Sequence, residues 1–158
     1  FSRIQMPTDD EALTLFAALH ANIYRAFDYG SEEEIYDVLS QSVDGALLDD
    51  LYAQIYKSLI LRYSGGAVCK VAKVDILEAR LIQKTREAAS GEHTVEIGCR
   101  WQVQGIVEHW EHLHRRVNEY EARFTLSPRA RTWKICRVDI TSQERVEAED
   151  KPRGRDEG

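Results

Sequence analysis

Three of the five histidines of this chain lie close together, at His109, His112 and His114. Imidazole is the side chain that gains or loses a proton near neutral pH, and it is also the commonest metal ligand. His112 and His114 would point to the same side of a β-strand, because strand side chains alternate between two faces. The cluster therefore raises three hypotheses: a metal site, the floor of a ligand pocket, and a hairpin end that carries no site.

A metal ion would be shared by His112 and His114, and His109 would join it from across a turn. Zinc sites in proteins usually have three or four protein ligands, and the nearby carboxylates are Glu108 and Glu111. The sequence has no HExxH motif, the helical histidine pair of many zinc enzymes. The three histidines are therefore candidate ligands of a divalent metal with an incomplete ligand set, and no other cofactor is expected.

The ligand-pocket hypothesis comes from the alternation of side chains along the strand that contains His112 and His114. Phe124 belongs to an alternating apolar pattern that would face the core. Every second residue before it would face the same way, provided that no β-bulge interrupts the strand. Together with an aromatic side chain of the preceding strand, these residues predict a pocket for a small polar or anionic molecule. The predicted ligand-binding residues are Trp101, His112, His114, Arg116, Asn118 and Tyr120.

An enzyme would use the same residues. His112 or His114 would act as the general base, and Arg116 would stabilise developing negative charge in a cofactor-free isomerase or hydrolase. No carboxylate is predicted to face inward, because the clearest candidates, Glu119 and Glu121, alternate with the apolar residues and would face solvent. A non-catalytic module is therefore favoured over an enzyme.

Three helices are predicted in the first half of the chain. The first begins at Thr8, where Glu11 completes a capping box, and the second repeats the pattern with Ser31 and Glu34. The third occupies the segment DGALLDDLYAQIYKSLILRY, whose apolar residues recur at steps of three and four. His20 lies on the apolar stripe of the first helix, which predicts a core histidine with a hydrogen-bond partner.

Four strands are predicted after the helices, at 67–84, 93–107, 118–128 and 132–140. The second and third alternate cleanly between apolar and polar residues, whereas the first alternates imperfectly. Helices followed by strands are typical of α+β domains, with the helices on one face of an antiparallel sheet. We therefore expect three N-terminal helices on about four long strands, in a single domain over 1–146. Residues 147–158 are charged and are predicted to form a disordered tail.

Composition narrows the class of protein. The 158 residues are 43% hydrophobic and 30% charged, the balance of one globular domain. The net charge of −6 disfavours a nucleic-acid partner, and no apolar run approaches the roughly 20 residues of a membrane span. The three cysteines, Cys69, Cys99 and Cys136, form no CxxC pair and are predicted to be buried strand residues. A single disulfide between two of them is the alternative.

The closing strand carries a family resemblance. Three N-terminal helices followed by long antiparallel strands that end in Trp133-Lys134-Ile135 resemble the NTF2-like (SnoaL-like) α+β cone superfamily, over roughly 8–146. The resemblance implies a curved sheet. The segment SQSVDG leaves little room for the short strand that often lies between the second and third helices, so a variant is implied. The superfamily includes isomerases, hydrolases and dehydratases as well as binding and assembly domains, and fold alone does not choose among them.

The leading hypothesis is a module that binds a small ligand or a partner protein, as a domain of a larger or membrane-anchored protein. The chain begins at Phe1 without a signal-like segment, which suggests an excised or processed product. The sequence does not determine the cellular compartment; an extracytoplasmic location, as part of an anchored protein, is one alternative. Apolar residues such as Trp110, Leu113, Tyr36 and Tyr56 need not all fit in one core. A homodimer that covers the convex face of the sheet is therefore expected.

Overall fold

The computed structural model describes residues 4–63, 68–109 and 112–152, without the side chains of 58–63, 68–69, 109 and 151–152. Its elements are α1 (Asp9–Arg25), η1 (Ala26–Asp28), α2 (Glu32–Ser40), α3 (Ala46–Tyr63), β1 (Val68–Arg86), β2 (His93–His109), β3 (His112–Arg129) and β4 (Thr132–Pro152). The strands pair antiparallel in chain order, β1-β2-β3-β4. The predicted α+β class is confirmed. Within the described residues, no helix is long and apolar enough to cross a membrane.

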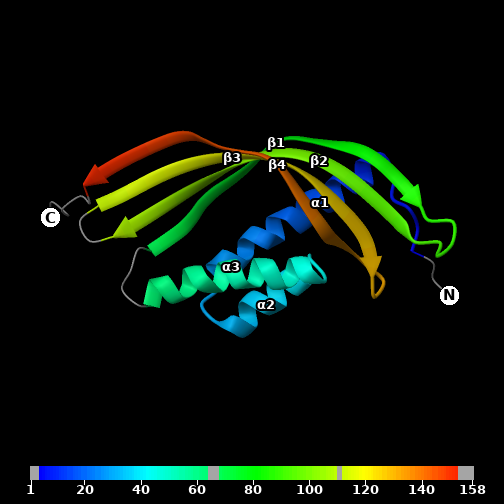
Figure 1. Cartoon of the computed structure of the whole chain (residues 1–158), viewed down its shortest axis with the longest axis horizontal. Helices are drawn as coiled ribbons and strands as arrows, with labels where there is room; N and C mark the ends of the chain where they lie inside the picture. The colour runs from blue at the N-terminus through cyan, green and yellow to red at the C-terminus, as the bar shows by residue number, and fades with distance from the viewer. Residues whose placement is uncertain (1–3, 64–67, 110–111, 153–158) are drawn as a thin grey trace.

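The sheet arches over the helices (Figure 1). The central strands β2 and β3 pair without a register shift, from Val95 opposite Leu126 to His109 opposite His112. The outer strands are different, because each carries three extra residues that have no partner in the register, spaced five residues apart. These residues are Ala72, Leu77 and Ile82 in β1 and Cys136, Thr141 and Val146 in β4. Each β-bulge bends its strand and increases the local twist, which explains why β1 alternates imperfectly.

The helices pack under the concave face, and the main core lies between the two layers (Figure 1). Its largest fully buried side chains include Phe16 of α1, Leu39 of α2 and Ile97 of β2. The segment between α2 and α3 contains no strand but makes one parallel bridge, between Val43 and Ile135. The SQSVDG segment is therefore long enough to reach the sheet, where Ile135 accepts from the N–H of Asp44 and donates to the backbone oxygen of Ser42.

The described part of the convex face, which a homodimer was expected to cover, carries several ion pairs. Arg100 forms ion pairs with both Glu78 and Glu119, and Arg123 forms one with Glu96. Trp110 lies outside the described residues. The exposed large hydrophobic residues of the described chain include Leu77 and Val146 of the outer strands, and the homodimer stays a prediction.

The C-terminal strand is longer than the sequence pattern indicated. Residues 147–152, assigned above to a disordered tail, continue β4 along β3. The reason is electrostatic, because the acidic residues of this segment face basic residues of β3. Glu147 pairs with Arg115, and Asp150 pairs with Arg116. Residues 153–158 lie outside the description.

The predicted capping box is complete at the start of α1, and an N-cap hydrogen bond starts α2. The backbone N–H of Glu11 donates to Thr8 Oγ1 at 3.2 Å, and the backbone N–H of Thr8 donates to Glu11 Oε1 at 3.0 Å. At the start of α2 the N–H of Glu34 donates to Ser31 Oγ at 3.3 Å, but the Glu34 carboxylate accepts from the Ser31 hydroxyl at 2.9 Å and not from its backbone N–H. Such caps satisfy backbone donors that the first turn of a helix leaves without partners.

We expect Thr8→Ala to lower the free energy of unfolding by about 1 kcal/mol, the usual cost of losing an N-cap side chain. Thr8→Ser keeps a hydroxyl acceptor and should cost much less. Chemical denaturation followed by circular dichroism measures both. Equal losses in the two variants would show that the Thr8 hydroxyl does not stabilise α1.

Candidate functional site

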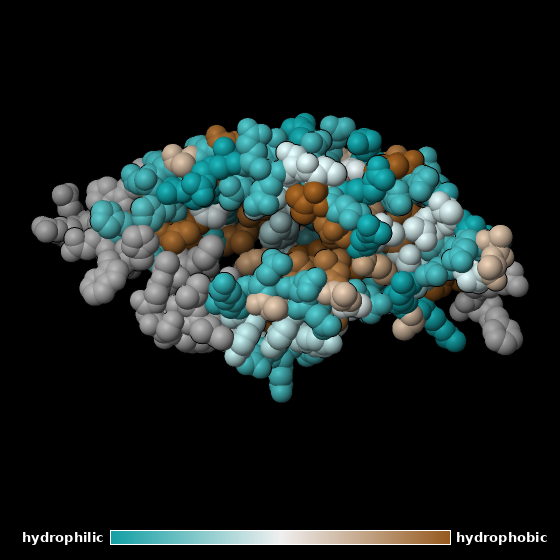
Figure 2. All heavy atoms as spheres, in the orientation of Figure 1, coloured by the Kyte–Doolittle hydropathy of each residue, from teal (hydrophilic) through white to brown (hydrophobic). Residues whose placement is uncertain are grey.

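A hollow of about 610 Å³ lies between the concave face of the sheet and helices α1 and α3. Brown, hydrophobic residues are visible in it between the two layers (Figure 2). The described residues around it come from every strand and from α1, η1 and α3. They are His20, Ile23, Tyr24, Phe27, Leu47, Asp50, Leu51, Gln54, Ile55, Val71, Trp101, Val103, Gly105, Asn118, Tyr120, Phe124, Val138, Ile140 and Gln143.

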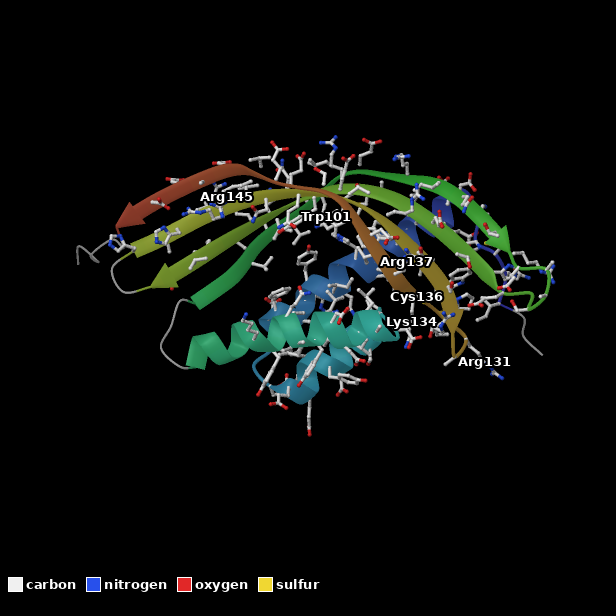
Figure 3. All side chains as sticks on the ribbon, in the orientation of Figure 1. Trp101, Arg131, Lys134, Cys136, Arg137 and Arg145 are labelled. Carbon is white, nitrogen blue, oxygen red and sulfur yellow. The ribbon has the colours of Figure 1, made fainter. Side chains whose placement is uncertain are left out.

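Trp101 is the centre of the aromatic wall and lies on the helix side of the sheet (Figure 3). It is 4% exposed. Its ring stacks on Tyr120 at 5.3 Å and contacts the ring of His20 edge-on at 5.0 Å, both measured between ring centroids. Its indole N–H donates to Tyr24 Oη at 2.8 Å. Burial raises the pKa of Tyr24 to about 12, so the phenol is neutral under ordinary conditions. The hydrogen bond ties α1 to the middle of the sheet.

His20 is buried as predicted, with 2% of its surface exposed, but the predicted hydrogen-bond partner is not there. Among the described residues, its Nε2 atom has no partner. Aromatic rings surround the imidazole, with Phe16 at 5.5 Å, Tyr24 at 5.3 Å and Phe124 at 5.7 Å between centroids. This burial lowers the pKa of His20 to about 4, so the ring is neutral at neutral pH. Sequence alone predicted the position on the helix but not the missing partner.

The structure divides the predicted ligand-binding residues into two groups. Trp101, Asn118 and Tyr120 line the hollow. They do so because the uninterrupted pairing of β2 and β3 keeps the predicted alternation, with Trp101 opposite Tyr120. For these three residues, the alternation predicted from the sequence gives the correct face of the sheet.

The other half, His112, His114 and Arg116, lies further along β3 and outside the lining of the hollow. His114 is six residues from Tyr120, a distance of about 20 Å along a strand. His114 Nδ1 lies 2.6 Å from Asp150 Oδ1, and Arg116 forms an ion pair with the same atom at 2.7 Å. The hydrogen bond from His114, followed by that from Arg116, lowers the pKa of the exposed Asp150 carboxyl. These side chains hold the end of β4 and do not meet Trp101.

The metal hypothesis receives no support from the described side chains. They include no group of three or more histidine, cysteine or carboxylate residues that could hold an ion. The His112 and His114 rings stack at 6.1 Å between centroids. The side chain of His109 and all of Glu111 lie outside the description, so their part in a site stays a prediction. Cys99 and Cys136 are free, and the Cys69 side chain is not described.

Three polar residues at the hollow were not singled out by sequence reasoning. Asp50 and Gln54 come from α3, and Gln143 comes from β4. Asp50 and Gln54 directly precede two stripe residues, Leu51 and Ile55, so the edge of the apolar stripe was the available signal. For Gln143 no such signal exists, because the bulges of β4 change which of its residues face inward.

Comparison with known proteins identifies a fold but no family. No protein-family model and no curated protein matches the chain. Among solved structures, the chain is similar to the intermembrane space region of the chloroplast protein ARC6, with a TM-score of 0.59 and 15% sequence identity. The match covers 86% of this chain and 98% of that one. At this identity the likeness shows a shared fold and nothing more.

The neutral state of His20 makes stability depend on pH. In the unfolded chain His20 takes up a proton near its ordinary pKa of 6.5, whereas in the folded protein it does so only near pH 4. Between these values the unfolded state binds more protons, so the folded state loses stability as the pH falls. The pKa difference corresponds to a loss of about 3 kcal/mol by pH 4.

We expect His20→Leu to remove this part of the pH dependence, because leucine neither titrates nor leaves a polar atom without a partner. Chemical denaturation at a series of pH values, carried out on both proteins, measures the difference. The two stability curves should diverge below about pH 6.5 and become parallel again below about pH 4. Curves that stay parallel throughout would show that His20 is not held neutral by the fold.

Proposed function

We propose that this chain is a non-catalytic binding module that holds an uncharged, mainly apolar small molecule in the hollow beneath Trp101. The observation that carries the proposal is the lining itself, an aromatic and aliphatic surface with a few polar groups. A hollow of about 610 Å³ is in the size range of small-molecule sites, which are concave and mostly apolar.

The charges around the hollow favour an uncharged occupant over the anion expected from the sequence. Among the described lining residues there is no lysine or arginine, and Asp50 contributes a carboxylate. Arg116, the cation expected to bind an anion, instead pairs with Asp150. A buried anion needs a partner charge or several hydrogen-bond donors, and the described lining supplies no positive charge.

Binding is also better supported than acid–base catalysis. A general base works best when its pKa lies near the working pH. His20, at about 4, and Tyr24, at about 12, are both far from neutral. His112 and His114, the bases of the alternative enzyme hypothesis, lie outside the lining. Neither His20 nor Tyr24 is therefore ready to move a proton near neutral pH, and Asp50 is the one carboxylate on the described lining.

The same proposal includes membership of the NTF2-like cone superfamily. Helices under the concave face, the bridge between Val43 and Ile135, and Trp133 packed against the core support it. Lys134 Nζ also donates to the backbone oxygen of Ser40 at 2.7 Å, which joins the closing strand to the end of α2. A role as one domain of a larger or anchored protein is consistent with the likeness to a region of another protein.

Gly105→Trp tests the site by filling it. A Cβ atom at Gly105 would meet only ordinary contacts, 3.8 Å from Lys70 O and 4.0 Å from Arg116 O, so the indole can project into the hollow. The uncharged, solvent-sensitive dye Nile red should bind the wild-type protein, with a blue shift of its emission. We expect at least about tenfold weaker binding to the variant, a loss of about 1.4 kcal/mol or more.

Gln104→Trp is the matched control, because it adds the same side chain one residue away on the opposite face of β2. This variant should bind Nile red as the wild-type protein does. The proposal fails if the dye does not bind the wild-type protein. It fails equally if the two variants, shown to be folded by circular dichroism, weaken binding to the same extent.

A further inference from the structure

We propose that His20 and Tyr24 form a hydrogen-bonding anchor for one uncharged oxygen atom of the ligand. The hollow would then select apolar molecules that carry a hydroxyl or carbonyl group over pure hydrocarbons and over carboxylates. This inference rests on the proposed function and names the class of molecule that the same site binds.

Tyr24 supplies a donor that has no acceptor among the described residues. The indole N–H of Trp101 can only donate, so in their 2.8 Å hydrogen bond the Tyr24 oxygen is the acceptor. The hydroxyl proton of Tyr24 is left to donate elsewhere. No hydrogen bond from Tyr24 to an acceptor is found in the part of the chain that the structure describes, and Tyr24 lines the hollow.

His20 supplies the second group. A neutral imidazole has one N–H donor and one nitrogen acceptor, and Nε2 of His20 is buried without a partner among the described residues. A buried polar atom in this state destabilises the fold until a partner reaches it. A ligand hydroxyl could donate to Nε2 or accept from it, and a carbonyl could accept, so either group satisfies both His20 and Tyr24.

Access to Nε2 requires the imidazole or its neighbours to move slightly, because the atom is covered. His20 is among the residues that line both the hollow and a smaller cleft of about 250 Å³ between α1 and β1.

Charge excludes the alternatives. The imidazole is neutral at neutral pH, and the described lining has no cation to bind a carboxylate. Asp50 on the same lining would repel one. A protonated ligand amine would be attracted by Asp50, but it has no lone pair to accept the Tyr24 proton. An uncharged oxygen matches both free groups.

The test compares three probes with one ring system, namely naphthalene, naphthol and naphthoate, by calorimetric titration at neutral pH. One added hydrogen-bonding group should make naphthol bind about two- to tenfold more tightly than naphthalene. Naphthoate should bind most weakly. His20→Leu and Tyr24→Phe should each reduce the preference for naphthol while naphthalene binding is retained.

His93→Leu is the matched control. His93 Nδ1 is the other buried side-chain atom without a partner in the described residues, but it lies at the start of β2, outside the lining of the hollow. This variant should keep the preference for naphthol. In NMR spectra of the wild-type protein, the imidazole nitrogens of His20 should shift with naphthol and not with naphthalene, an effect that a purely structural His20 would not show.

The outcomes separate the two proposals. If naphthalene and naphthol bind the wild-type protein equally, or the preference survives in both variants, the anchor is refuted and the hollow remains a binding site. If no probe binds, the proposed function fails and the anchor fails with it. Tyr24→Phe keeps the ring but removes the hydroxyl and with it the hydrogen bond from Trp101, so circular dichroism must show that it is folded; it then decides the question even if His20→Leu does not fold.

Discussion

The unequal length of the strands is the constraint on which the rest of this structure depends. The β2–β3 pair runs in continuous register, whereas β1 and β4 each insert an extra residue at intervals of five. The outer strands must therefore bend around the inner pair, and the sheet curves over the helices (Figure 1). A flat sheet would meet α1 and α3 along its whole area. The curved one encloses a hollow between them. The bulges also interrupt both edges, which discourages pairing with another strand.

The aromatic wall turns this shape into a site. Trp101 stands where the sheet curves, and its hydrogen bond to Tyr24 fixes the distance between α1 and β2. Phe16 and Phe124 pack behind it at 4.8 Å between ring centroids. Because these rings are stiff and buried, they hold His20 in place without hydrogen bonding to its Nε2 atom. The same contacts that stabilise the fold therefore determine the chemistry of the hollow.

Sequence patterns predicted most of the architecture, because helix caps and strand alternation are local signals. The caps at Thr8 and Ser31 and the parity of β3 from Asn118 to Phe124 are examples. The patterns could not predict how far each strand extends or which parts of other elements lie beside it. Alternation predicts the face on which a residue lies, but not whether a helix covers that part of the face. His114 thus has the predicted direction and lies beyond the reach of α1 and α3.

The buried Nε2 atom of His20 is informative because the lack of a hydrogen-bond partner destabilises the folded protein. A buried nitrogen without a partner destabilises a fold by about 1–3 kcal/mol, a large part of the marginal stability of a domain this size. A leucine at this position of α1 would fill similar space without that cost. Backbone strain and buried polar atoms without hydrogen-bond partners tend to occur at functional sites. Two buried side-chain atoms have no partner among the described residues, and one of them, Nε2 of His20, belongs to a residue on the lining of the hollow of about 610 Å³, beside a tyrosine with a proton left to donate. A ligand oxygen between the two would remove the cost, so binding would itself stabilise the domain.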